Sequence, residues 1–240
     1  MHRPLPSPVD ASAGDHAPGA PAPRRYHHGD LASALLDAGE AELTDKGVEA
    51  FSLRGVAKRA GVSHAAPAHH FRDVNGLLTA IAAHGFERFV ARQEDFRRRA
   101  PDTPHARLVA SGVGYVVFAQ EHPALFRLMF GSSRPDFADA DLGGAAAAAH
   151  ADLVRHVSAV TGRDPAVQPD PRAMADVACV WALAHGLADL LVAGRLAAVA
   201  ALPAQQRLET IAALVSRIVP AGEAPAAGSK GKGLADGAGV

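Results

Sequence analysis

Residues 52–71 read SLRGVAKRAGVSHAAPAHHF, and this stretch decides the fold of the N-terminal part of the chain. Its apolar residues recur at the i, i+3, i+4 and i+7 spacing of a short amphipathic helix, namely at Leu53, Val56, Ala57 and Ala60. Ser52 stands before this stripe as an N-cap, and Gly61 follows it, where a left-handed residue ends a helix. Ser63 offers a second N-cap, so a second short helix is expected to start about three residues later. The pattern predicts a helix-turn-helix, whose second helix lies in the DNA major groove.

The charge pattern of the same stretch favours phosphate binding. No Asp or Glu occurs between Ala50 and Arg72, whereas positive charges are supplied by Arg54, Lys58, Arg59 and Arg72. Three histidines lie beside these cations, at His64, His69 and His70. Because the whole chain has a net charge of −1, nucleic-acid affinity would come from this local patch. The alternative is a pair of surface helices whose charges are only solvated, since helix-turn-helix geometry also occurs in proteins that bind no DNA.

The composition indicates an all-α, cytoplasmic protein. The 240 residues suffice for one large domain or two small ones, and no segment repeats the period-2 pattern of a β-strand. The single cysteine, Cys179, excludes an internal disulfide framework and is expected to be an inert core thiol, because it lies in an apolar run. No signal peptide is recognisable, and charged or polar residues interrupt the apolar runs short of a membrane span, so no membrane contact is expected.

The distribution of Pro, Gly and apolar residues divides the chain into regions. The predicted regions are a disordered Pro/Ala-rich tail at 1–25, a helix-turn-helix domain at 26–89, a helical C-terminal domain at 100–219 and a disordered tail at 220–240. The first tail ends in Arg24 and Arg25. A flexible basic arm beside a helix-turn-helix reaches phosphates or the minor groove, but the same residues also suit a simple linker.

Caps and breakers mark the other helices. The first is expected to begin at Asp30 and to end at Gly47, and a longer one to follow Asp73 and to stop before Pro101. Further helices are predicted over residues 105–121, 124–130, 139–161 and 172–195, and after Pro203.

The N-terminal motif resembles that of TetR/AcrR-type transcriptional regulators. The matching pieces are LRGVAKRAGVS, HHF followed shortly by Leu77-Leu78, and Gly29-Asp30-Leu31 before them. The resemblance implies a three-helix DNA-binding domain that a fourth, long helix joins to a sensing domain. The residues expected to contact operator DNA are Arg24, Arg25, Arg54, Lys58, Ser63, His64, His69 and His70.

Three positions depart from the usual pattern of that family. Ala68 stands where a Tyr is usual in the recognition helix, and Val74 where a Lys usually starts the fourth helix. Gly55 replaces a Glu that would close a capping box with Ser52. Two phosphate contacts are therefore missing while histidines remain, which predicts operator binding that is weaker or more sensitive to pH than the motif suggests.

The C-terminal half resembles one subgroup of TetR-like regulators. The matching pieces are residues 115–119 (YVVFA), residues 121–130 (EHPALFRLMF) and residues 181–186 (WALAHG), the last being the Trp-His-Gly (WHG) element of that subgroup. A small-molecule site would be concave and mostly apolar, with few polar groups. The expected ligand-binding residues are Tyr115, Phe118, Phe126, Met129, Phe130, Trp181 and His185. The alternative for each of these residues is an ordinary core position.

Catalytic, cofactor and metal motifs are not found in the sequence. The adjacent pairs His27-His28 and His69-His70 point to different sides of a helix, and no Cys accompanies them. There is no Gly-x-Ser-x-Gly elbow, P-loop or dinucleotide fingerprint. We therefore expect no metal, no cofactor and no enzymatic activity, with a helical enzyme as the least favoured alternative.

The last two long helices carry more apolar surface than one small domain needs, which predicts a homodimer through a four-helix interface. Two recognition helices would then meet half-sites about one helical turn apart. The sequence thus predicts a ligand-responsive transcriptional repressor, associated with the nucleoid, that binds operator DNA and a small apolar or amphipathic effector. The alternative function is a dimeric ligand-binding or protein-interaction module with weakened or lost specific DNA binding. The alternative to the dimer is a C-terminal helix that packs only on its own domain.

Overall fold

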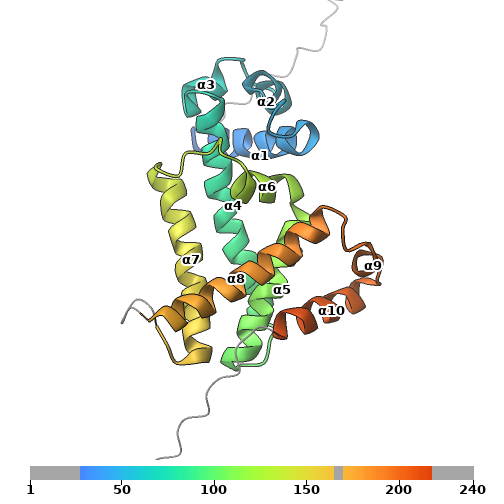
Figure 1. Ribbon diagram of the computed structural model, residues 1–240. Coiled ribbons are helices and arrows are strands. Elements are labelled where there is room, and N and C mark those ends of the chain that lie inside the picture. The colour runs from blue at the N-terminus through green and yellow to red at the C-terminus, as the bar shows by residue number, and fades with distance from the viewer. Residues whose placement is uncertain (1–27, 165–169, 218–240) are drawn as a thin grey trace, which may run out of the picture.

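The computed structural model describes residues 28–164 and 170–217, and within these ranges the chain forms ten helices and no strand (Figure 1). The all-α prediction is confirmed. The helices are α1 (His28–Lys46), α2 (Leu53–Ala60), α3 (Ala66–Phe71), α4 (Val74–Arg97), α5 (Pro104–Glu121), α6 (Pro123–Gly131), α7 (Ala140–Thr161), α8 (Pro171–Val192), α9 (Ala197–Ala200) and α10 (Ala204–Ser216). The tails predicted at 1–25 and 220–240 lie outside the described residues.

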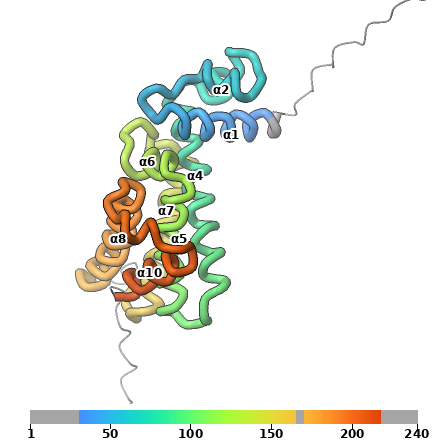
Figure 2. Tube along the Cα trace, turned by 90° about the vertical axis from the view of Figure 1, so that its right-hand side faces the viewer, coloured from blue at the N-terminus to red at the C-terminus, as the bar shows by residue number. Residues whose placement is uncertain are grey.

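Helices α1, α2 and α3 form a small unit at one end of the long helix α4 (Figures 1 and 2). Their shared core contains buried side chains of α1, α2, the α1–α2 loop and α4, among them Leu35, Leu43, Phe51, Val56 and Leu77, and Phe71 of α3 packs against it partly buried. Since α4 supplies part of this core, the unit is built on the N-terminal turns of α4 rather than standing apart from it.

Helix α2 begins and ends where its sequence predicts. The Ser52 hydroxyl accepts a hydrogen bond from the Gly55 amide at 3.1 Å, and Gly61 ends the helix with φ of 68°. Helix α3 starts three residues after Ser63, but the predicted cap is wrong. Ala65 occupies the N-cap position without a side-chain hydrogen bond, because a further turn, closed by the Ala66 amide and the Ser63 carbonyl at 3.0 Å, separates Ser63 from the helix.

Helix α4 follows α3 almost without a linker. Asp73 caps it by accepting a hydrogen bond from the Gly76 amide at 2.9 Å, as predicted. Arg72 closes α3 with φ of 68°, the left-handed region that non-glycine residues rarely adopt. A Cβ at Gly76 would overlap the Phe71 carbonyl, so the end of α3 and the first turn of α4 touch through their backbones.

The C-terminal domain wraps the remaining length of α4. Helices α5 and α7 pack along it, α8 crosses α5 obliquely, and α10 lies against α5 (Figures 1 and 2). Close packing depends on small residues, since a Cβ at Gly85 would lie 2.8 Å from the Met129 sulfur, and one at Gly114 would lie 2.8 Å from the Gln93 Cα.

Several boundaries differ from the predicted ones. Helix α1 begins two residues before Asp30, because an Asp is favourable both as a cap and within a first helical turn, where it meets the helix dipole. Helix α8 ends at Val192 rather than at Arg195, and the short helix α9 was not predicted. The prediction of a core thiol is also wrong. Cys179 is exposed on α8, because an almost wholly apolar helix does not reveal which of its faces is buried.

Candidate nucleic-acid interface

The structure places the predicted DNA contacts on one continuous part of the chain, from α2 through the turn into α3. Arg54, Lys58, Ser63, His64 and His69 are exposed, and His70 is half-buried. The rings of His69 and His70 meet edge to face with centroids 5.7 Å apart. These side chains are free to meet a polyanion, whereas the predicted arm residues Arg24 and Arg25 lie outside the described residues.

Arg59 differs from its neighbours, because it holds α2 against α1. Its Nε donates to the Glu42 carboxylate at 2.7 Å, and its Nη2 also donates to Asp45. The hydrogen bonds to Glu42 and Asp45 raise the pKa of Arg59. Arg59 is therefore paired with carboxylates of α1, whereas the side chains of Arg54 and Lys58 have no hydrogen-bond or ion-pair partner among residues 28–164 and 170–217.

The structure gives a physical reason for glycine at position 55. A Cβ on Gly55 would overlap the Glu42 carboxylate, whose side chain is 7% exposed. The acidic group beside the start of α2 thus comes from α1 rather than from a capping box within α2. The other two departures lie at the surface, since Ala68 is exposed and Val74 is half-buried against the core.

A cation that sequence reasoning missed lies at the start of α4. The Arg134 guanidinium, from the loop between α6 and α7, donates from Nε to the Asn75 side-chain oxygen at 2.8 Å. Close to this contact, the Asp136 amide donates to the Thr79 hydroxyl at 3.0 Å. The loop of the C-terminal domain therefore binds the first turns of α4 next to the recognition helix. No local sequence signal marks this contact, because its partners are 59 residues apart.

A second polar contact joins the N-terminal unit to the C-terminal domain. Arg88 of α4 donates to the Glu40 carboxylate of α1 and lies 3.1 Å from His122 Nε2. His122, between α5 and α6, also lies 3.5 Å from Glu40. Burial lowers the pKa of His122, and the adjacent Arg88 charge lowers it further.

A buried ion pair fixes the far end of α4. Arg97 is 3% exposed, and its Nη1 donates to Asp152 of α7 and to the Ser111 hydroxyl of α5, each at 2.7 Å. Glu94 completes the set at 2.7 Å, and its hydrogen bond with Arg97 lowers the pKa of Glu94. Three helices of the C-terminal domain are therefore joined through one guanidinium.

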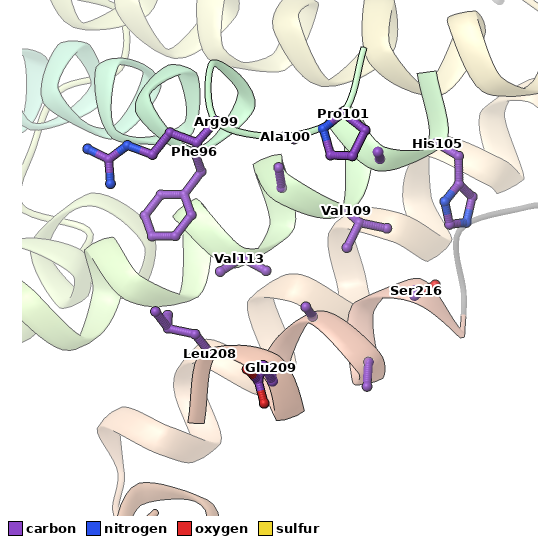
Figure 3. Close-up of a pocket in the computed structure, with 14 residues that line it drawn as sticks. Phe96, Arg99, Ala100, Pro101, His105, Val109, Val113, Leu208, Glu209 and Ser216 are labelled. Atoms are coloured by element: carbon purple, nitrogen blue, oxygen red, sulfur yellow. The ribbon is translucent and has the colours of Figure 1, made fainter. Parts of the chain in front are cut away.

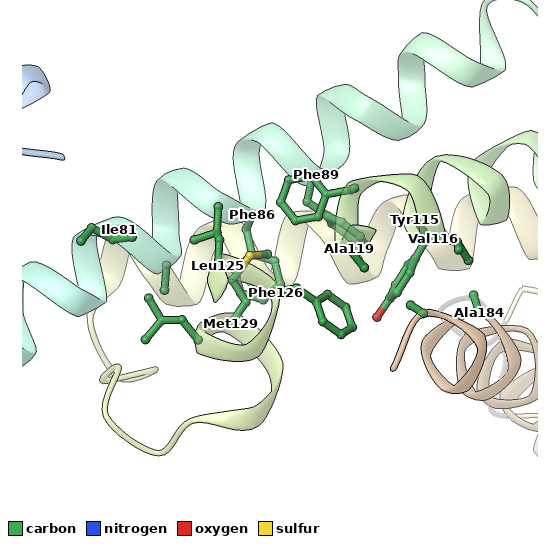
Figure 4. Close-up of a cluster of buried hydrophobic side chains, with 14 of the residues drawn as sticks. Ile81, Phe86, Phe89, Tyr115, Val116, Ala119, Leu125, Phe126, Met129 and Ala184 are labelled. Atoms are coloured by element: carbon green, nitrogen blue, oxygen red, sulfur yellow. The ribbon is translucent and has the colours of Figure 1, made fainter. Parts of the chain in front are cut away.

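Six of the seven predicted ligand-binding residues are brought together. Tyr115, Phe126 and Met129 are at most 6% exposed and lie in one cluster of buried side chains (Figure 4). Phe118, 1% exposed, belongs to the same cluster, and Phe130 packs against Tyr115 and Phe126. The Tyr115 hydroxyl lies 2.8 Å from His185 Nδ1, and burial raises the pKa of Tyr115. The seventh, Trp181, is 44% exposed on α8 but also reaches this group, because its side chain hydrogen-bonds with Tyr115.

Helix α8 carries an exposed apolar face. Met174 is 61% exposed and Leu190 is 38% exposed, and Cys179 and Trp181 are also exposed. In the described part of the chain, α8 is the one helix that is long and apolar enough to cross a membrane, although such helices also occur in the cores of soluble proteins. The larger apolar residues of α10 instead turn inward, with Ile211 and Val215 almost fully buried.

Side chains that could ligate a metal are scattered over the structure. Within residues 28–164 and 170–217, no three His, Cys, Asp or Glu side chains are grouped so that they could hold a metal ion. The expectation of no metal and no cofactor remains a prediction from the sequence.

Comparison with known proteins gives matches in both halves of the chain. Residues 35–81 match the model described as bacterial regulatory proteins, tetR family, and residues 108–218 match a tetracyclin repressor-like C-terminal domain. The HTH-type transcriptional regulator BetI of Burkholderia thailandensis is 36% identical over 76 residues, which are 32% of this chain and 39% of that protein. The chain thus matches well under half the length of this relative.

Solved structures match over most of the chain. A protein of unknown function from Rhodococcus sp. RHA1 is 33% identical with a TM-score of 0.64, covering 82% of this chain and 98% of that one. Two further solved structures share the fold. A TetR-like regulator from Rhodococcus sp. RHA1 is 15% identical with a TM-score of 0.56, covering 80% of this chain and 97% of that one. The TetR family regulator PfmR from Thermus thermophilus is 18% identical with a TM-score of 0.56, covering 79% of this chain and 99% of that one. With both domain models matched in order on one helical chain, the protein belongs to the TetR family of bacterial regulatory proteins.

Proposed function

We propose that the protein is a DNA-binding transcriptional regulator that acts as a ligand-released repressor. The observation that carries this proposal is the surface of α2 and α3, where exposed cations and imidazoles occur without an acidic residue from Ala50 to Arg72. Arg54 and Lys58 would bind phosphates, and the His64–His70 segment would enter the major groove. The arm residues Arg24 and Arg25 would add backbone contacts.

The functional unit is proposed to be a homodimer formed mainly through α8. Its exposed Met174, Trp181 and Leu190 are large apolar side chains that a second copy would cover. Helix α10 contributes less than its sequence suggests, because its larger apolar residues pack on α5 of the same chain. Two copies would present two recognition helices to a two-fold symmetric operator.

The connection between the two halves supports the proposal that an effector releases the DNA. A small apolar or amphipathic molecule bound in the C-terminal domain would favour one arrangement of α4 relative to its neighbours. Since α3 is backed by the first turn of α4, that arrangement sets the separation of the two recognition helices in the dimer. The aromatic group around Tyr115 and His185 is one candidate for the effector site, with Trp181 at its solvent-exposed edge. Such a regulator works in the cytoplasm, next to the DNA it binds.

A salt titration with the DNA upstream of the protein's own gene tests the proposal. Fluorescence anisotropy gives the association constant. Its logarithm is expected to fall linearly with the logarithm of the salt concentration, with a slope of about −0.9 for each phosphate contacted. Arg54→Ala and Lys58→Ala should each reduce the steepness of that slope by roughly one contact.

The matched control is Arg195→Ala, because Arg195 is exposed beyond α8, outside the helix-turn-helix. Its affinity and slope should equal those of the wild type. If the wild type shows no salt-dependent binding to this DNA, the repressor proposal fails in favour of a ligand-binding or protein-interaction module.

A further inference from the structure

A groove opens between the C-terminal end of α4, helix α5 and helix α10 (Figure 3). Its volume of about 670 Å³ lies within the range of small-molecule sites, about 300–1,000 Å³. Val109, Ala110 and Val113 of α5 line it together with Phe96 of α4 and Leu208 of α10. The groove lies at the opposite end of α4 from the recognition helix, and it shares no residue with the aromatic group around Tyr115.

The sequence creates this groove through residue size. Helix α10 touches α5 closely at one place, where a Cβ on Gly112 would lie 2.6 Å from Val215 Cγ1. Beside that contact, small side chains from both helices leave space, namely Ala106, Ala110, Ala212 and Ala213. The walls are therefore apolar and open to water, which is unfavourable unless another molecule covers them.

The charged residues around the groove differ in their partners. Arg98 pairs with Asp95, and Arg107 pairs with Asp102 at 3.1 Å. Arg99 and His105, which line the groove, are exposed, and their side chains have no hydrogen-bond or ion-pair partner among residues 28–164 and 170–217.

The carboxylate on the opposite wall of the groove, on α10, already has a hydrogen-bond partner. This residue, Glu209, accepts a hydrogen bond from the Gln205 amide at 2.8 Å. The available charge beside the apolar floor is therefore positive, with Arg99 beside Phe96 at one end of the groove and His105 at the other (Figure 3).

We infer that this groove binds an amphipathic carboxylate, a molecule with an elongated apolar body and one anionic end. The body would lie along α5 between Phe96 and Leu208, and the carboxylate would meet Arg99, which lies beside Phe96 (Figure 3). Such a ligand would connect α10 to the end of α4, which Arg97 already ties to α5 and α7. Binding of this ligand does not depend on the proposed function. Only its role as the effector rests on that proposal.

Calorimetric titration of the full chain without DNA tests the inference. The probes are dodecanoate, dodecanol and dodecylammonium, which share one chain length and differ in charge, each kept below its micelle-forming concentration. Dodecanoate is expected to bind at least tenfold more tightly than the other two. Arg99→Gln should remove this preference, whereas Arg98→Gln, the matched control on the adjacent exposed arginine, should keep it within twofold.

A second variant tests the apolar floor. Ala110→Trp fills the groove and should abolish dodecanoate binding, with the far-ultraviolet circular dichroism of the wild type retained. Equal binding of the three probes, tighter binding of dodecylammonium, a preference that survives Arg99→Gln, or no binding at all would each overturn the inference. Because these titrations contain no DNA, their outcomes do not test the proposed DNA binding, which the salt titration tests separately.

Discussion

Gly55 illustrates how a residue that weakens a helix locally can be required by its neighbour. In a helix interior Gly costs roughly 1 kcal/mol relative to Ala. Here, however, a Cβ would displace the Glu42 carboxylate that holds Arg59. Tertiary packing against α1 therefore outweighs local propensity at this position.

Gly55→Ala is expected to lower the free energy of unfolding by about 1–3 kcal/mol, because it separates Glu42 from Arg59 within a largely buried contact. Urea denaturation measures the change. Gly144→Ala is the control, since Gly144 lies on the exposed side of α7 with nothing within 4 Å of an added Cβ. That variant should gain up to roughly 1 kcal/mol. A stabilised Gly55→Ala protein would contradict this account.

Ala68 and Val74 are the positions at which the DNA-reading surface lacks the side chains usual in the family. Introducing Ala68→Tyr and Val74→Lys together should raise operator affinity, and the added Lys should steepen the salt dependence by about 0.9. Anisotropy titrations at several salt concentrations provide both values. Unchanged affinity and slope would remove the basis for predicting weak operator binding from these two residues.

Among the elements, α4 depends most on contacts between distant parts of the chain. Arg97 near its end is buried with Asp152, and removing one partner of such a pair costs about 3–5 kcal/mol, because the other charge stays buried. Arg97→Met is therefore expected to lose free energy of unfolding in this range, whereas Arg97→Met combined with Asp152→Leu should recover much of it. Urea denaturation of the single and double variants gives the coupling energy.

The matched control for that series is Arg98→Met, because the Arg98 side chain is 62% exposed and, in the described part of the chain, pairs only with Asp95 of α4. It should change the free energy of unfolding by less than about 0.5 kcal/mol. A loss in the Arg97→Met variant no larger than that of the control would show that the buried network does not fix the end of α4.

The contact between α1, α4 and the start of α6 predicts a pH dependence. Because burial and Arg88 lower the pKa of His122, the unfolded chain binds a proton there more readily than the folded one. Stability should therefore fall as pH drops below about 6.5, the ordinary histidine pKa, and the fall should continue down to the lowered folded-state pKa. Unfolding measured from pH 5 to 8 should show a shallower slope in His122→Gln. The exposed His150→Gln variant should keep the wild-type slope.

The elements themselves were largely predictable because their ends depend on local chemistry. Ser52 caps the start of α2, and the left-handed Gly61 ends it. Asp73 caps the start of α4. What the sequence could not reveal are contacts such as Arg134 with Asn75, which depend on how distant segments meet. The exposed face of α8 could not be predicted for a different reason. Apolar residues occur on all sides of this helix, so its sequence does not indicate which side is buried.

For the whole molecule, the exposed face of α8 predicts the oligomeric state. Ala182→Glu places a charge at an exposed position of that face and should convert a dimer into a monomer of 24.7 kDa in sedimentation velocity. Ala147→Glu, on the exposed side of α7, should leave the dimer intact.

The single cysteine provides an independent readout of the same interface. Cys179 is exposed on α8, so a short bis-maleimide should link two copies of the wild type and should fail with the Ala182→Glu variant. A wild-type protein that sediments as a monomer would contradict the proposed dimer. A dimer that Ala182→Glu does not disturb would place the interface elsewhere than on α8.

The short junction between α3 and α4 has a mechanical consequence. With 24 residues, α4 is about 36 Å long at 1.5 Å per residue, and only Arg72 and Asp73 separate it from α3. If its C-terminal end pivots by about 5°, the far end sweeps roughly 3 Å, close to the 3.4 Å rise of one base pair along a DNA strand. In the proposed repressor, a small rotation of α4 within the C-terminal domain would therefore move α3 by about one base-pair step along the operator.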